Sequence, residues 1–250
     1  FFWEWFHRLW GRLIGVAFAL PMIFFWVKGY IPPKDRLTYV GLLILGGGQG
    51  ALGWFMVKSG LVDRPSVSHF RLAAHLSLAL TIYAALLWMG LRNLPMKKIT
   101  VSPSLKRHGI VALICVSATI IWGAFVAGLD AGMIYNTFPL MGNSFAPPEL
   151  GNAPFLYDHA SVQFTHRMLA MLTGLVVFSY GLRWAIIDRK IGAILAGWVV
   201  VQIGLGIATL LTIVAIPVAA THQLGAILLL SFVLYSLYIA DIPARRTISS

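Results

Sequence analysis

Seven stretches of the chain are dominated by apolar residues over about 20 positions, the length that a helix needs to cross a bilayer. They lie at about 9–27, 38–57, 71–91, 109–129, 166–186, 191–214 and 219–240. Short polar segments separate them, except for one long connection at 130–162. The pattern predicts an all-α polytopic membrane protein with seven spanning helices in this chain.

The chain also contains an internal repeat. The stretch Glu4-Trp5-Phe6-His7-Arg8 returns in altered form as Gln163-Phe164-Thr165-His166-Arg167. The same comparison pairs Gly15 with Gly174. It also pairs Gln49, Leu52 and Gly53 with Gln202, Leu205 and Gly206, in that order, and it pairs Ala73 and His75 with Ala220 and His222. Internal repeats are common in membrane proteins, which place binding sites at or beside the repeat interface.

The repeat predicts two pseudo-symmetric four-helix bundles. The first half, residues 1–92, begins at its His-Arg helix, whereas the second half, 109–250, has a helix ahead of that point. We therefore expect one further helix before Glu4, which would make eight. Residues 93–108 form a basic linker between the halves.

Composition agrees with this class, because 59% of the 250 residues are hydrophobic and only 11% are charged. The net charge of +11 does not point to nucleic acid, since the basic residues lie in short connections between apolar runs. One side of the predicted membrane protein holds Lys28, Lys34, Arg36, Arg92, Lys97, Lys98, Lys106, Arg107, Arg183, Arg189, Lys190, Arg245 and Arg246. Segment 130–162 has no Lys or Arg. The basic side should therefore face the cytoplasm or the mitochondrial matrix.

Four histidines fall in matched places of the repeat: His7, His75, His166 and His222. Each lies in the first turns of a helix that starts from the outer side, so all four should lie at similar depth. Two histidines from facing helices can hold a haem iron axially. The alternative for each is a hydrogen-bonded core residue. Zinc is disfavoured because the pairs lack a third ligand at short spacing.

Glu4 distinguishes the two halves. It stands at i−3 from His7 and so shares its helix face, whereas its counterpart Gln163 cannot titrate. A carboxylate beside a reacting centre can move protons or stabilise positive charge. The first half is therefore the candidate reaction site and the second the candidate electron relay. Alternatively, Glu4 simply pairs with Arg8 at i+4.

Several other residues near the outer ends of the helices are candidates for contact with a ligand. Arg8, Arg71 and Arg167 can pair with haem propionates or can anchor the helices at the interface. Arg12 is expected to point inward. We expect His69 and His159 in outer loops and His108 in an inner one. The row Gly46, Gly47, Gly48, Gly50 and Gly53 suits close helix packing or room for a flat ligand.

At these residues the sequence resembles the heme A synthase family. The resemblance is carried by Glu4-x-x-His7-Arg8, Phe70-Arg71-Leu72-Ala73-Ala74-His75, Gly128-Leu129-Asp130-Ala131-Gly132, Tyr135-Asn136-x-Phe138-Pro139-x-Met141-Gly142, Gln163-x-x-His166-Arg167 and Thr221-His222-Gln223. It covers nearly the whole chain and looks closest to the mitochondrial and alpha-proteobacterial branch. Another branch carries cysteine pairs in its outer loops, which this chain lacks.

The resemblance implies an enzyme of the bacterial or mitochondrial inner membrane that oxidises the C8 methyl of heme O to the formyl of heme A for cytochrome oxidase. It implies a resident haem b on His166 and His222, a substrate haem between His7 and His75, and Glu4 as catalytic acid. These sites would face the periplasm or intermembrane space. Expected partners are heme O, heme O synthase as its source, an unidentified electron donor, the lipid bilayer and a second copy of the chain, but not nucleic acid.

The chemistry leaves one question open. If both His7 and His75 bind the substrate iron, no coordination position remains for dioxygen. Either one histidine leaves the iron, or the methyl group loses electrons and then gains water. A different function also fits the four histidines: a bis-histidine b-type cytochrome that only transfers electrons, which gives Glu4 no task. A transporter or structural subunit would bind no haem.

Overall fold

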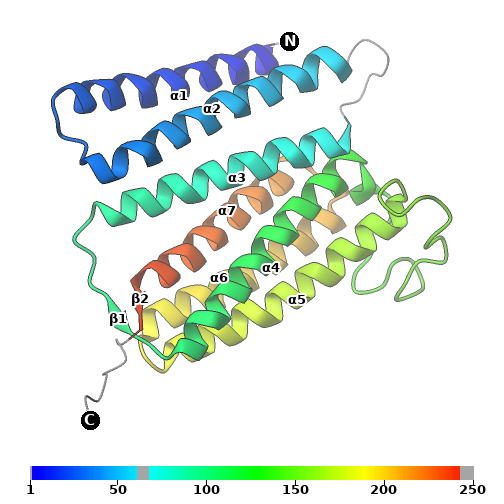
Figure 1. Ribbon diagram of the computed structural model, residues 1–250. Helices are drawn as coiled ribbons and strands as arrows, with labels where there is room; N and C mark the ends of the chain where they lie inside the picture. Colours follow the sequence, from blue (N-terminus) through cyan, green and yellow to red (C-terminus); the bar gives the residue numbers. More distant parts are fainter. Residues whose placement is uncertain (1, 61–67, 243–250) are drawn as a thin grey trace. The chain divides into compact units, whose positions relative to one another are not determined.

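A computed structural model describes residues 2–60 and 68–242, without the side chains of Glu4 and of residues 57–60. Arg245 and Arg246 of the predicted basic side lie outside the described residues. Within the described part, seven helices are long and apolar enough to cross a membrane. They are α1 (Phe2–Val27), α2 (Pro33–Gly60), α3 (His69–Arg92), α4 (Pro103–Gly128), α5 (His159–Ala185), α6 (Arg189–Leu211) and α7 (Ile216–Ile239) (Figure 1). The predicted all-α polytopic membrane protein is confirmed.

The helices begin earlier than the apolar stretches do. Helix α4 starts at Pro103 rather than at 109, and α5 starts at His159 rather than at 166. The oxygen of Ser102 accepts from the backbone N–H of Leu105, and the carboxylate of Asp158 accepts from that of Ala160. Such caps satisfy the free N–H groups of a first turn and let a helix start in polar sequence. Hydropathy marks only the part that lies in lipid.

The chain divides into two compact units, residues 1–86 and 87–250, with the boundary inside α3. In the second unit, α5 packs on α4 and α6, and α7 also packs on α4 and α6, so the four helices close into a bundle (Figure 1). Small residues permit close contacts within it. A Cβ added to Gly181 of α5 would lie 2.7 Å from the backbone nitrogen of Ala196 of α6.

Two short strands, which the sequence pattern did not predict, fix the direction of this bundle. Strand β1 (Ile99–Thr100) pairs in parallel with β2 (Ala240–Asp241). Because β1 comes just before α4 and β2 directly follows α7, the start of α4 and the end of α7 meet at one end. Helices α5 and α7 therefore both start from the opposite end.

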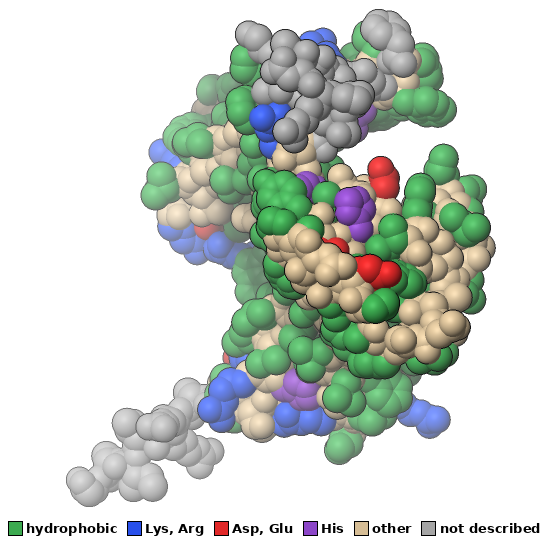
Figure 2. Space-filling model, turned by 90° about the vertical axis from the view of Figure 1, so that its right-hand side faces the viewer, with side chains coloured by type: hydrophobic (Ala, Val, Ile, Leu, Met, Phe, Trp, Pro, Cys, Tyr) green, Lys and Arg blue, Asp and Glu red, His purple; other side chains and the backbone are tan. Residues whose placement is uncertain are grey.

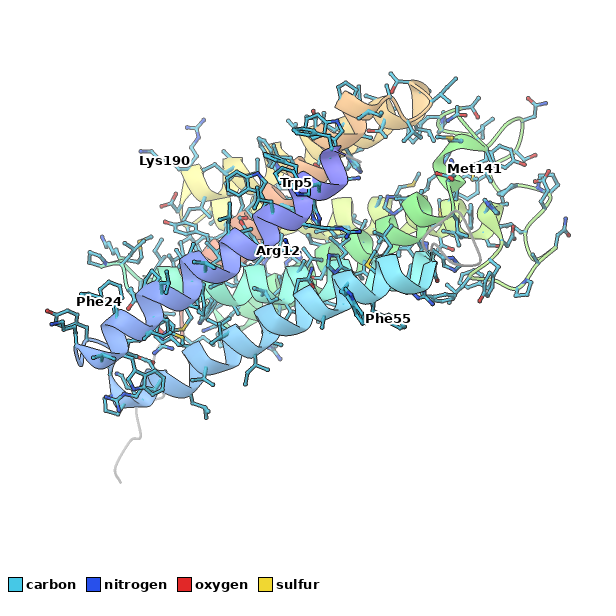
Figure 3. All side chains as sticks on the ribbon, turned by 90° about the horizontal axis from the view of Figure 1, so that it is seen from above. Trp5, Arg12, Phe24, Phe55, Met141 and Lys190 are labelled. Atoms are coloured by element: carbon cyan, nitrogen blue, oxygen red, sulfur yellow. The ribbon has the colours of Figure 1, made fainter. Side chains whose placement is uncertain are left out.

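The first unit contains α1, α2 and most of α3. Helix α1 packs along α2, and none of its predicted membrane span is buried. Arg12, labelled on α1 in Figure 3, is exposed. Because none of the span of α1 is buried, exposure does not decide the direction of Arg12, and its inward orientation stays a prediction.

Candidate functional site

The second unit brings His166 and His222 together near the start of their helices. His166 lies seven residues after the start of α5 and His222 six residues after the start of α7, which puts both about 10 Å along their helices. The two imidazoles are close enough to interact electrostatically. Each ring lies against a glycine: an added Cβ at Gly123 would lie 3.4 Å from Cε1 of His166, and one at Gly206 would lie 3.0 Å from Cε1 of His222.

The polar contacts of these two rings differ. The side-chain nitrogen of Gln202, on α6, lies 3.1 Å from Nδ1 of His222 and donates to the backbone oxygen of His222 at 2.9 Å. Within the described structure, Nδ1 of His166 and Oε1 of Gln202 are buried and have no hydrogen-bond partner. Buried polar atoms without partners are uncommon in proteins and can indicate a missing ligand.

The segment between α4 and α5 folds over this end of the bundle. It contains a short 3-10 helix, η1 (Ala131–Met133), and Met141, labelled in Figure 3, is only 1% exposed within it. Figure 2 faces the end of the molecule that carries this segment and shows acidic and histidine side chains among hydrophobic ones. The segment spans residues 129–158, because α5 begins earlier than predicted.

Gln163 and Arg167 attach this segment to α5. The Gln163 amide donates to the carbonyl of Tyr135 at 2.9 Å. The Arg167 guanidinium donates to the carbonyls of Tyr135 and Thr137 at 2.9 Å and of Leu140 at 3.3 Å. A carboxylate at position 163 could not donate to these carbonyls, which gives a structural reason for an amide where the first half has Glu4.

The predicted pairing of Arg167 with a haem propionate is not tested by these contacts. Both terminal nitrogens bond to loop carbonyls, and Nε is buried with no partner among the described residues. Sequence reasoning missed the anchoring of the loop by Arg167. The only signal for it was a basic residue beside a long segment that itself has no Lys or Arg.

Two carboxylates order the loop. The Tyr135 hydroxyl donates to Glu149, and this hydrogen bond raises the pKa of Tyr135. Burial alone would raise the pKa of the Asp158 carboxyl. Hydrogen bonds from Ser161 Oγ at 2.5 Å and from the backbone N–H groups of Gly151 and Ala160 outweigh burial, so the pKa of Asp158 is lowered. Asp158 therefore stays ionised as the cap of α5.

The first unit brings His7 and His75 together in the same way. His7 of α1 and His75 of α3 are close enough to interact electrostatically. The side-chain nitrogen of Gln49, on α2, lies 3.1 Å from Nε2 of His75, whose Nδ1 is buried with no partner among the described residues. A Cβ added to Gly53 would lie 3.2 Å from Cε1 of His75.

The remaining predicted residues of this unit are Glu4, Arg8 and Arg71. Glu4 lies in the first turn of α1, but its side chain is outside the described structure. Arg8 is exposed. The guanidinium of Arg71 lies 4.9 Å from the centre of the ring of Phe55, which is labelled on α2 in Figure 3. A propionate role for either arginine stays a prediction.

The repeat read from the sequence therefore corresponds to a repeated arrangement in space. In each unit a glutamine and a glycine one turn apart on one helix contact the histidine of the next helix. The units differ deeper in the membrane. In the second unit a Cβ added to Gly174 would lie 2.7 Å from Ile203. In the first unit Gly15 matches Gly174 and Gly50 matches Ile203, and an added Cβ at either glycine meets nothing within 4 Å among the described residues.

This open space bears on the two interpretations of the glycine row. Among the described residues an added Cβ at Gly46, Gly47 or Gly50 meets nothing within 4 Å. These three glycines are exposed, so the described structure leaves both interpretations open, close packing against a further helix or room for a flat ligand. The other two glycines of the row have a neighbour: an added Cβ at Gly48 would lie 3.8 Å from Leu78, and Gly53 lies against the ring of His75.

The three histidines without a repeat partner are placed differently from the prediction. His108 lies in α4 rather than in an inner loop, where it contacts the carbonyl of Val176 at 3.1 Å and Arg183 Nη1 at 3.1 Å. His69 and His159 are the first residues of α3 and α5 rather than loop residues. His69 is buried and His159 is exposed. The helices start earlier than hydropathy indicates, which explains all three differences.

The two histidine pairs fit an axially held haem. Each pair consists of imidazoles from two helices of one unit, and a glycine at the edge of a ring leaves space that a Cβ would fill. Imidazoles from facing helices of a bundle are suited to haem iron.

Comparison with known proteins agrees with the resemblance seen in the sequence. A family model described as COX15-CtaA, cytochrome oxidase assembly protein, matches residues 1–234. A heme A synthase of Rhodospirillum centenum is 47% identical over 97% of this chain and 68% of its own length. One of Maricaulis maris is 43% identical over 92% of this chain and 70% of its own.

A mitochondrial relative gives the same result. The heme A synthase COX15 of Bos taurus is 44% identical over 93% of this chain and 61% of its own length. The family model covers α1 to α6 and most of α7, so it includes both histidine pairs. The chain belongs to the COX15-CtaA family of cytochrome oxidase assembly proteins.

Proposed function

We propose that this protein is a heme A synthase, an oxidoreductase that converts the C8 methyl group of heme O to the formyl group of heme A for cytochrome oxidase. The observation that carries the proposal is the presence of two similar histidine pairs, one in each unit, in a chain that is 43–47% identical to relatives of that name. A protein that only transfers electrons would account for the pairs but not for a difference between them.

The second unit is the proposed site of a resident haem b, with His166 and His222 as its axial ligands. A haem bound there supplies one-electron transfer. Gly123 and Gly206 leave space for the two rings, and Gln202 holds His222 in place. Arg167 fastens the loop over this end of the bundle.

The first unit is the proposed site of heme O, between His7 and His75. Heme O is larger than haem b because it carries an isoprenoid chain. The space beside Gly15 and Gly50 supports this assignment, since Gly174 and Ile203 fill the corresponding place in the second unit. Gly15 follows His7 by eight residues, about 12 Å along α1, so this space lies deeper in the membrane than the histidines.

Glu4 is the proposed catalytic acid. It lies three residues before His7 on α1, and positions three residues apart share one face of a helix. If an electron acceptor oxidises the methyl group and water supplies the oxygen atom, a carboxylate can stabilise the positive charge on the carbon and accept the proton that is released. Arg8 and Arg71 are the proposed partners of the substrate propionates.

The proposed location is the inner membrane of a bacterium or a mitochondrion. The basic connections would face the cytoplasm or matrix, and both histidine pairs would lie towards the periplasm or intermembrane space. Heme O synthase would deliver the substrate, and an electron carrier would complete the reaction. A homo-oligomer is consistent with the exposed apolar surface of α1.

Replacement of Glu4 tests the proposal. In the full-length protein, Glu4→Gln should leave both haems bound but should lower the yield of heme A by roughly 100-fold or more, the range for loss of an acid–base group. The yield is measured by chromatography of extracted haems. Glu149→Gln is the control, because Glu149 contacts Tyr135 in the loop of the second unit and has no assigned role in the first unit. An unchanged heme A yield in Glu4→Gln would refute the catalytic role of Glu4.

A further inference from the structure

Gln49 and Gln202 occupy matching positions of the repeat but contact different nitrogens of their histidines. Gln49 Nε2 lies 3.1 Å from Nε2 of His75. Gln202 Nε2 lies 3.1 Å from Nδ1 of His222 and 2.9 Å from its backbone oxygen. In both units the Cε1 edge of the ring faces a glycine, so the rings sit similarly and only the contacted nitrogen differs.

The contacted nitrogen matters because an axial histidine binds iron through one ring nitrogen and forms a hydrogen bond through the other. In the second unit the contact is at Nδ1, which leaves Nε2 of His222 for iron. The same nitrogen of Gln202 also donates to the backbone oxygen of His222, so the amide holds this histidine at two points and neither of them is Nε2.

In the first unit the contact is at the other nitrogen. Nδ1 of His75 is buried with no partner among the described residues, so Nε2 is the nitrogen that can reach a ligand. Gln49 already contacts Nε2. An amide N–H and an iron would use the same lone pair, so they cannot both bind it. The contact of Gln49 therefore opposes ligation of iron by His75.

We propose that Gln49 is a positioning residue that makes His75 an exchangeable ligand of the substrate haem, whereas Gln202 keeps His222 as a permanent one. This inference rests on the proposed function, in which the first unit must bind heme O and release heme A while the second retains its haem. When His75 leaves the iron, Gln49 provides it with a hydrogen bond. One neutral hydrogen bond changes such an equilibrium by roughly 2- to 12-fold.

The test compares Gln49→Leu with Gln202→Leu in the full-length protein. Leucine has a similar volume and forms no hydrogen bond. The protein is loaded with haem b and heme O, excess apo-globin is added as a scavenger, and the loss of each haem is followed by chromatography. Gln49→Leu should slow the release of heme O by roughly 2- to 12-fold and leave haem b unchanged. Gln202→Leu should speed the release of haem b.

Spin state supplies a second measurement. Gln49→Leu should raise the low-spin fraction of the bound ferric heme O, because His75 then ligates more fully, and a purely structural defect would lower it. Gln49→Asn, whose amide is one methylene too short to reach His75, should behave like Gln49→Leu and serves if that variant folds poorly. Faster or unchanged release of heme O in both Gln49 variants would overturn the inference. Failure of the unaltered protein to bind heme O would overturn the proposed function as well.

Discussion

Arg167→Met gives a sharp test of how the outer loop is held. Methionine keeps a long apolar stem but has no N–H donors. The change removes three hydrogen bonds from the guanidinium to the carbonyls of Tyr135, Thr137 and Leu140. The bond to Leu140, at 3.3 Å, is long, so the two at 2.9 Å should dominate.

The expected magnitude follows from those two bonds. A hydrogen bond to a charged group contributes about 1.5–3 kcal/mol, and Thr137 is exposed, so its carbonyl can regain water. The lower figure is therefore appropriate for each, which gives roughly 3 kcal/mol for the two. Opening of the loop should become roughly 100-fold more frequent. The bundle itself should stay folded, because its helix contacts are untouched.

Hydrogen exchange measured by mass spectrometry on the haem-free protein reports this opening. The useful amides are those of Met141, which donates to Ser144, and Gly142, which donates to Thr137. Arg71→Met is the control, because Arg71 was given the same propionate role but lies against Phe55 in the first unit. If Arg167→Met leaves the haem-free loop as protected as the unaltered protein, Arg167 does not anchor the loop. Its main role would then be at the haem.

Two further predictions concern the cradle of His222 and the cap of α5. Gly206→Ala should weaken retention of haem b, because the new Cβ would lie 3.0 Å from Cε1 of His222 and such overpacking costs about 1–3 kcal/mol. Gly197→Ala is the control, because its new Cβ meets nothing within 4 Å among the described residues. Equal haem content in the two variants would contradict the claim that Gly206 leaves space for the ring of His222. The pKa of Asp158 in the folded protein is lowered from about 3.8, the ordinary value. The hydrogen-bonded carboxylate therefore stabilises the fold at pH values above 3.8, and this stabilisation is lost as the pH falls through the folded pKa. Asp158→Asn should thus lower the thermal midpoint near pH 7 and have little effect once the pH is well below the folded pKa of Asp158, and a loss that does not vary with pH would contradict this.

Much of the architecture could be predicted because the bilayer imposes a simple rule on sequence. A span needs a long apolar stretch, and a repeat places equivalent residues at equivalent depth. The pairing of His7 with His75 and of His166 with His222 in space agrees with that reasoning. Their roles as ligands remain predictions.

The features that sequence reasoning missed depend on local hydrogen bonds rather than on hydropathy. The early start of α5 comes from the cap at Asp158, and β1 and β2 are each two residues long, too short to produce an alternating pattern. The contact of Gln49 with one ring nitrogen and of Gln202 with the other cannot be read from two identical residues at matching positions. It depends on the orientation of each imidazole, which packing decides.

The central claim is that one unit holds a resident haem while the other holds a haem that reacts. The most direct measurement is extraction and chromatographic identification of the haems from the full-length protein, purified out of cells that make heme O. The account predicts haem b together with heme O and heme A. Haem b alone, at two per chain, would contradict it and would identify an electron-transfer cytochrome.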